Sequence, residues 1–249
     1  MLFDFMIEIK MLKDQNLKGY TLIEAFPGIG LVGTMAGSYI IDKLPMEYIG
    51  HITSDMFPPI ASIHNSVPMY PARIYKNDKY KLLMFIAEFA VPVNLVYQLS
   101  SEILAFSRKY GISKIVSVGG MPSDKPTNTI YITSSDPDLA KKATKLGIKP
   151  IDEGVVAGVS AYLLVNSNEL KISSMDVLVE VNPTVTDPRY AEIAITGLNK
   201  LLGINVDLAE LKKETEIVEN KIREMLSKVK ASHEHYANTA AGNGPSMYA

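Results

Sequence analysis

Residues 20–33, with the sequence YTLIEAFPGIGLVG, decide the fold class of this 249-residue chain. The apolar run at residues 20–26 is typical of a buried strand, and residues 27–30 predict a turn because they combine Pro27 with two glycines. Residues 31–44 then carry apolar side chains at helical spacing. A strand that passes through a glycine turn into a helix is the repeating unit of α/β proteins, so we expect that class.

The same turn contains a GxGxxG pattern, formed by Gly28, Gly30 and Gly33, which between a strand and a helix is typical of dinucleotide binding. Asp55, near the end of the next predicted strand, is a possible ribose ligand. The alternative is a tight turn whose glycines allow close packing without a ligand. Pro27 favours this alternative because it removes a backbone donor. We therefore predict no cofactor, and we keep a nucleotide-binding enzyme that uses the Gly28 to Gly33 turn as an alternative function.

Strand and helix signals alternate outward from the turn. Further strands are predicted at residues 46–53, 72–76, 80–89, 114–118, 129–133 and 175–181. Further helices are predicted at residues 94–110, 136–147, 158–168 and 187–203, with Asn94 and Asp187 as N-caps of the first and last. Residues 55–71 are rich in proline and are expected to form an irregular loop. The alternation favours a mixed or parallel sheet covered on both faces, in one α/β core domain over residues 1–205.

Composition argues against several functions. The chain has 25 basic and 27 acidic residues and a formal net charge of −2, so it gives no signal for nucleic-acid binding. It contains no cysteine, which excludes disulfides and thiolate chemistry. Asp4 and Glu8 interrupt the apolar N-terminus, and Glu88, Pro92 and Asn94 interrupt the longest apolar stretch, so neither a signal peptide nor a membrane span is predicted. We expect a cytoplasmic protein without membrane or nucleic-acid partners.

The sequence shows no recognisable catalytic set. Residues 158–162 lack the second glycine of a nucleophile elbow. Two of the four histidines, His233 and His235, fall in a C-terminal segment that could not hold a catalytic base in place. The carboxylates form no evident acid–base pair in the sequence. We therefore predict that the protein is not an enzyme and has no metal site.

Residues 206–230 predict a C-terminal helix that starts at Asp207, with Glu210 completing a capping box. Its apolar residues are spaced alternately three and four apart, which is typical of a coiled-coil seam. The oligomerisation candidates on this seam are Leu211, Val218, Ile222 and Met225. An amphipathic helix that lies on its own domain fits the same pattern.

Residues 231–249 are mostly small or turn-forming and predict a flexible tail. The tail ends in Met247, Tyr248 and Ala249, which together present a hydrophobic side chain, a tyrosine and a free carboxylate. Terminal carboxylates beside such side chains are a recurrent recognition element for small pockets. We predict that these three residues bind a partner.

Residues 26–34, FPGIGLVGT, resemble the signature turn of the proteasome assembly chaperone family, and weaker similarities follow in the family's order. These are Phe57-Pro58-Pro59, residues 154–164, Asp187-Pro188 and residues 203–207. The resemblance covers residues 15–230. Ala161-Tyr162 departs from the pattern, since smaller residues are expected there, and we expect this difference to affect packing rather than the partner site.

The resemblance implies a three-layer α/β/α fold with a mixed sheet, similar to nucleoside phosphorylases, without an established catalytic site. For archaeal-type members it also implies a homo-oligomer. In archaeal-type members the C-terminal hydrophobic-Tyr-X motif inserts into pockets between α-subunits of the proteasome ring, and here only Met247, Tyr248 and Ala249 match that motif. The expected partners are therefore proteasome α-subunits or the 20S core particle. An ATP-independent proteasome activator would use the same tail and remains an alternative.

Overall fold

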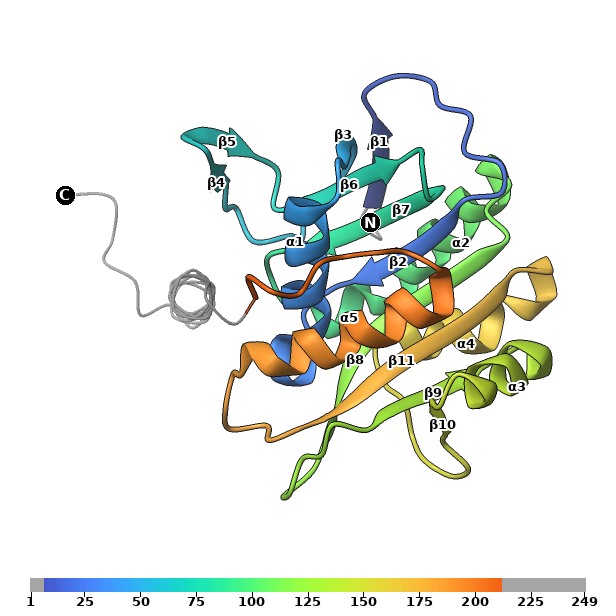
Figure 1. Cartoon of the computed structure of the whole chain (residues 1–249). Helices are drawn as coiled ribbons and strands as arrows, with labels where there is room; N and C mark the ends of the chain where they lie inside the picture. Colours follow the sequence, from blue (N-terminus) through green and yellow to red (C-terminus); the bar gives the residue numbers. More distant parts are fainter. Residues whose placement is uncertain (1–6, 212–249) are drawn as a thin grey trace.

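A nine-stranded mixed sheet runs through the fold, in the order β1-β3-β6-β7-β2-β8-β11-β9-β10 (Figure 1). The computed structural model describes residues 7–211. The strands of this sheet are β1 (Ile7–Met11), β2 (Thr21–Ala25), β3 (Glu47–Ser54), β6 (Ala72–Asn77), β7 (Leu82–Ala87), β8 (Lys114–Pro122), β9 (Ile130–Ser134), β10 (Lys149–Pro150) and β11 (Ser173–Val181). The central strands β7, β2, β8 and β11 are mutually parallel, whereas β1, β3 and β6 pair antiparallel on one side and β9 pairs antiparallel with β11 on the other.

Helices cover both faces of the sheet. The helices are α1 (Val32–Lys43), α2 (Val96–Tyr110), α3 (Pro137–Lys145), α4 (Val159–Asn166) and α5 (Pro188–Leu202), and short 3-10 turns lie at η1 (Ile29–Leu31), η2 (Val93–Leu95) and η3 (Asn168–Leu170). Apolar side chains of α1, α3 and α5 join one core cluster, and those of α2 and α4 join another on the opposite face. The arrangement confirms the predicted three-layer α/β/α class with a mixed sheet.

The central strands bury both of their faces. Every residue of β7 is buried, and its alternate side chains enter the two clusters, for example Met84 on the α1 side and Phe85 on the α2 side. A strand between two helical layers reads as a continuous apolar run for this reason. Burial of each such side chain contributes about 1.5–3 kcal/mol relative to exposure.

The ends of several helices follow from local sequence. The Asp187 carboxylate accepts the N–H of Arg189 at 2.9 Å at the start of α5, and Gly203 ends that helix with φ 65°. A glycine adopts this left-handed conformation at low cost. Asn94 was expected to cap α2, and this prediction was wrong. It lies inside η2, and Leu95 occupies the N-cap position without a side-chain hydrogen bond.

A small hairpin stands where an irregular loop was predicted. β4 (Ser62–His64) and β5 (Val67–Met69) pair antiparallel and project from the body of the fold (Figure 1). Asn65 and Ser66 form the two-residue turn with φ of 50° and 65°. Positive φ at both positions is typical of a type I′ turn, which suits hairpins. The loop prediction was therefore wrong for these residues.

The described chain ends against the first helix. Asp207 accepts the N–H of Ala209 at 2.9 Å, and the Glu210 carboxylate bonds to the Lys43 ammonium of α1 at 2.6 Å. Leu211 is 2% exposed within the core cluster beneath α1 and α5. The remainder of the predicted C-terminal helix lies outside the described residues. In the part of the chain that the structure describes, no helix is long and apolar enough to cross a membrane.

Candidate functional site

The Gly28 to Gly33 turn packs closely onto β8 and onto the end of β11. A Cβ atom on Gly33 would lie 2.5 Å from the carbonyl oxygen of Val118. A Cβ atom on Gly30, which has φ 68°, would lie 3.1 Å from the Val181 side chain. The α-hydrogens of Gly30 and Gly33 that a Cβ atom would replace therefore face protein atoms at contact distance. In a dinucleotide site, the second glycine lets the backbone approach a pyrophosphate. The packing favours the ligand-free tight turn.

This packing predicts that alanine substitutions at two glycines of the GxGxxG pattern will change the free energy of unfolding by different amounts. Gly33→Ala should lower the free energy of unfolding by about 1–3 kcal/mol, because its methyl group would overlap a backbone oxygen. Gly28→Ala is the matched control, since a Cβ there meets nothing within 4 Å. Urea unfolding of both variants measures the difference. Equal losses of stability at the two positions would contradict the packing argument.

Three polar side chains form a row across the centre of the sheet. Glu24 of β2 is in register with Ser117 of β8, which is in register with Asp176 of β11. They are 5%, 1% and 1% exposed, on the face that α2 and α4 cover. The Phe26 N–H donates to the Glu24 carboxylate at 3.0 Å. This carboxylate pair was not predicted from the sequence, because its members lie far apart in the chain.

Burial has the largest effect on the pKa of both carboxyl groups. It raises the pKa of Glu24 to about 7, against the neighbouring Ser117 hydroxyl and the Phe26 N–H, which lower it, and the nearby Asp176 charge raises it further. Burial likewise raises the pKa of Asp176 to about 6, opposed by the Ser160 hydroxyl of α4. Raised carboxyl pKa values are common at acid–base sites. Both carboxyl groups, however, are buried too deeply for a substrate to reach them, which favours a structural role.

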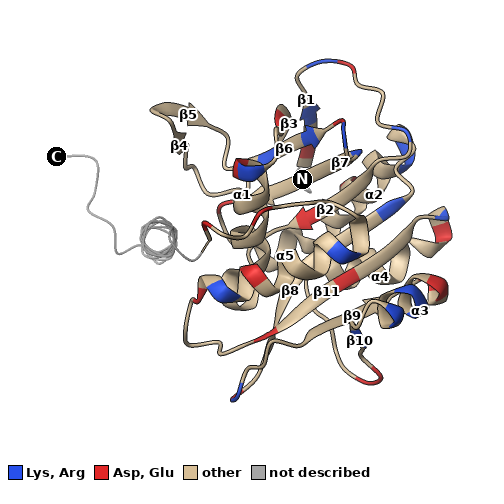
Figure 2. Cartoon of the chain, viewed as in Figure 1, with Lys and Arg blue, Asp and Glu red and all other residues tan. Residues whose placement is uncertain are grey.

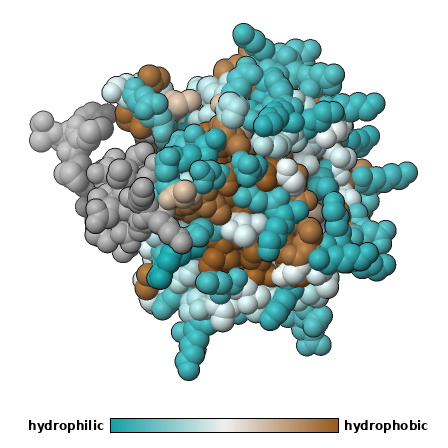
Figure 3. Space-filling model, viewed as in Figure 1, coloured by the Kyte–Doolittle hydropathy of each residue, from teal (hydrophilic) through white to brown (hydrophobic). Residues whose placement is uncertain are grey.

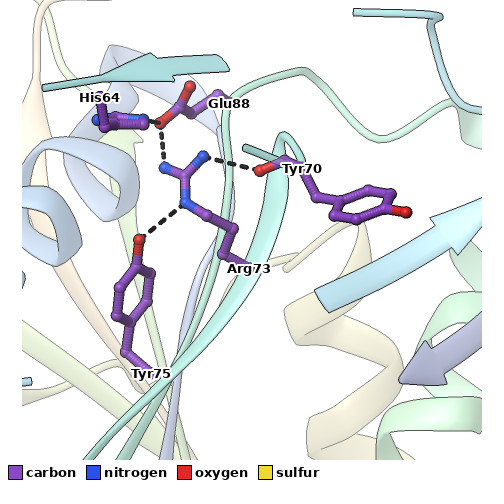
Figure 4. A network of polar contacts seen from close by, with 5 residues as sticks. All are labelled: His64, Tyr70, Arg73, Tyr75 and Glu88. Atoms are coloured by element: carbon purple, nitrogen blue, oxygen red, sulfur yellow. Dashed lines mark hydrogen bonds and ion pairs between the residues drawn. The ribbon is translucent and has the colours of Figure 1, made fainter. Parts of the chain in front are cut away.

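A second polar network fixes the projecting hairpin to the sheet (Figure 4). Arg73 of β6, 2% exposed, donates to the Glu88 carboxylate, to the Tyr70 carbonyl at 2.8 Å and to the Tyr75 hydroxyl at 2.9 Å. His64 of β4 contacts the same carboxylate at 2.7 Å. Glu88, which follows β7, thus joins the hairpin to the sheet through two partners.

The environment of Glu88 keeps it ionised. Burial acts to raise the pKa of its carboxyl, but the hydrogen bonds from His64 and Arg73 and the Arg73 charge outweigh it and lower the pKa to about 2. The anchored hairpin exposes Ile63 and Val67, at 63% and 56%, and Figure 3 shows apolar side chains on the hairpin. This network holds an apolar surface in a defined position and has no nucleophile.

Charge is mixed over the described fold. Lysine and arginine are interspersed with aspartate and glutamate among the labelled elements (Figure 2). Within residues 7–211, no group of three or more histidine, cysteine, aspartate or glutamate side chains is arranged to hold a metal ion.

The predicted site residues have different outcomes. Met247, Tyr248 and Ala249 lie outside the described residues, as do three of the oligomerisation candidates, Val218, Ile222 and Met225. Leu211, the fourth, packs into the core of its own chain. Apart from Leu211, the structure thus places none of the residues predicted to bind a partner.

Comparison with known families gives a direct result. The model of the PAC2 family matches residues 22–226. The chain belongs to the PAC2 family. An uncharacterized protein of Methanocaldococcus jannaschii is 30% identical over 204 residues, which cover 82% of this chain and 84% of that protein.

Solved structures of the family agree with this assignment. Pyrococcus furiosus PbaA, an archaeal homolog of proteasome-assembly chaperone, is 28% identical with a TM-score of 0.81, over 91% of this chain and 100% of PbaA. Pyrococcus furiosus PbaB, an archaeal proteasome activator, is 21% identical with a TM-score of 0.73, over 88% of this chain and 98% of PbaB, and shows the shared fold. The resemblance to the proteasome assembly chaperone family, based on residues 26–34, is confirmed.

Proposed function

We propose that this PAC2 family protein is a proteasome assembly chaperone-like protein that binds the proteasome α-ring through Met247, Tyr248 and Ala249. The similarity to PbaA along nearly the whole of both chains carries the role. The C-terminal motif supplies the docking element. A protein of this kind acts without catalysis, and its work on the proteasome would take place in the cytoplasm.

The chemistry of the terminus supports this use. Tyr248 offers a large aromatic surface and a hydroxyl that needs a partner when buried. Met247 suits an apolar recess, and the terminal carboxylate of Ala249 suits a basic group. Residues 231–249, fully extended, would reach at most about 60 Å. That length is sufficient to reach a pocket on a facing ring.

Tyr248→Ala should abolish capture of α-subunits or weaken it by about a hundredfold when several tails act together. A few residues added after Ala249 should have the same effect, because they displace the carboxylate. The matched control is Tyr236→Ala, which removes a tyrosine outside the motif. Pull-down of free α-subunits and of assembled core particle measures the binding of each altered chain. Undiminished binding by the extended chain would exclude a role for the carboxylate.

The same preparation separates a chaperone from an activator. An assembly chaperone should capture free α-subunits and increase the yield of rings in reconstitution. An ATP-independent activator should instead accelerate peptide hydrolysis by the finished core particle. For a nucleotide-binding enzyme at the Gly28 to Gly33 turn, calorimetry should show binding of ATP or NAD, and the close packing of Gly33 argues against it.

We also propose that the chain self-associates through the segment that follows Leu211. Replacing Val218 and Ile222 with lysine should lower the molar mass measured by light scattering, because charge would enter the predicted seam. Leu211 itself packs in its own core, so the seam would begin after it. An unchanged molar mass would mean that the interface lies elsewhere, for example at the apolar side chains over α1 and α5 that Figure 3 shows.

A further inference from the structure

A groove with a volume of about 500 Å³ lies between α2 and α4, on the sheet face opposite α1 and α5. Leu104, Ala105 and Leu170 contribute its apolar lining. Ala105 and Ser101 lie one turn apart on α2, and their small side chains leave room between the helices. The volume is in the range of small-ligand and peptide-end pockets.

One part of the groove combines aromatic rings with hydroxyl groups. The Tyr162 hydroxyl lies 2.9 Å from the Ser101 hydroxyl, and the Tyr162 ring contacts that of Tyr97 edge to face, with centroids 5.1 Å apart. The nearby Tyr162 hydroxyl raises the pKa of Tyr97, and Tyr97 is 70% exposed. An incoming phenol would find both ring surface and hydroxyl partners here.

The last turn of α2 supplies positive charge. Arg108 and Lys109 line the groove there, together with Glu169. Within the described residues, the Arg108 guanidinium has no carboxylate partner. A guanidinium binds carboxylates through paired, charge-assisted hydrogen bonds. The groove therefore presents an apolar floor, a hydroxyl pair and an arginine that has no carboxylate partner among residues 7–211.

We propose that this groove binds the C-terminus of the chain itself, Met247-Tyr248-Ala249, from the same or a neighbouring copy. The terminus has the three matching parts, namely an apolar side chain, a phenol and a free carboxylate. Residues 212–249 would span at most about 125 Å if extended, whereas a domain of this size has a radius of gyration of about 17 Å. The terminus can therefore reach the groove although Leu211 lies on the opposite face.

Binding at the groove would hold the docking motif in reserve until an α-ring competes for it. This regulatory meaning rests on the proposed function, whereas binding of the terminus to the groove rests on the groove alone. Tyr162 belongs to the Ala161-Tyr162 pair that departs from the family resemblance, and it gives the groove a hydroxyl that a smaller residue would lack.

The test uses a labelled hexapeptide, GPSMYA, and a chain that lacks residues 247–249, so that the groove is vacant. Fluorescence anisotropy should show saturable binding of the peptide with a free carboxylate, and at least about tenfold weaker binding of its C-terminal amide. Arg108→Ala should reduce binding of the acid to the level of the amide, with no further loss for the amide. Arg189→Ala, an exposed arginine on α5, is the matched control.

Three results would overturn the proposal: equal binding of acid and amide, equal binding of the peptide with the reversed sequence AYMSPG, or equal effects of Arg108→Ala and Arg189→Ala. A second measurement uses the full-length chain. Arg108→Ala should increase its affinity for α-subunits several-fold, because the terminus is released. If the protein does not bind α-subunits at all, the proposed function fails while the peptide measurement still decides the groove.

Discussion

Replacing Arg73 with methionine is expected to lower the free energy of unfolding by about 3–5 kcal/mol. The Arg73 guanidinium is almost fully buried and faces Glu88, whose side chain is 13% exposed. Methionine fills a similar volume but leaves the carboxylate without its principal positive partner. Loss of one member of a buried ion pair costs more than the pair contributes, because the remaining charge is still desolvated.

A double variant tests this explanation. Arg73→Met with Glu88→Leu removes both charges and should recover most of the stability lost by Arg73→Met alone. Guanidinium chloride unfolding at neutral pH measures all three proteins, and limited proteolysis monitors the β4–β5 hairpin, which should be cleaved faster in the single variant. A loss below about 1 kcal/mol for Arg73→Met would show that the pair behaves as a solvated surface contact.

Glu24→Gln is expected to raise the free energy of unfolding at pH 8 by about 3 kcal/mol and to change it little at pH 4.5. The pKa of Glu24 rises from its ordinary value of 4.5 to about 7 in the fold. Between these values the folded chain retains a proton that the unfolded chain releases. Stability therefore falls as pH rises through this range, and glutamine, which cannot ionise, avoids the loss.

Thermal unfolding followed by circular dichroism from pH 4.5 to pH 8 measures the effect. The difference in midpoint between Glu24→Gln and the unaltered chain should grow with pH to roughly 6–12 °C. Glu153→Gln is the control, since that acid lies exposed in the loop before α4. A difference that stays constant across the range would mean that Glu24 is already ionised in the fold and stabilised by other groups.

Elements with local signals were predictable from the sequence. Helix α5 has its N-cap Asp187, Pro188 at the first helical position and Gly203 at its end, and all three act locally. The strand, turn and helix around Gly28 were predictable for the same reason. The sheet order was not, because it depends on pairing between segments far apart in the chain, and β1 and β10 carried no clear pattern of their own. The β4–β5 hairpin was obscured by the prolines of residues 55–71, which predicted an irregular loop.

The candidate sites also differ in how far they could be predicted from the sequence. The motif at Met247, Tyr248 and Ala249 is a local pattern at a chain end, so the sequence alone indicated it, and it stays a prediction. The Glu24 and Asp176 pair exists only through strand register, although an acid within each apolar strand is a usable signal. Arg108, which has no carboxylate partner within residues 7–211, could not be predicted as part of the α2–α4 groove, because the groove forms between two helices separated by several strands.

The position of β11 between β8 and β9 has a consequence for synthesis on the ribosome. β8 and β9 follow one another in the chain but are joined only through β11, which begins at Ser173. Nascent chains emerge at about 5–20 residues per second. Until β11 has been synthesised, one side of β8 and one side of β9 have no strand to pair with. Unpaired strand edges promote association between chains. The emerging polypeptide therefore passes through a stage that is prone to aggregation, and this stage ends when Ser173–Val181 joins the two strands.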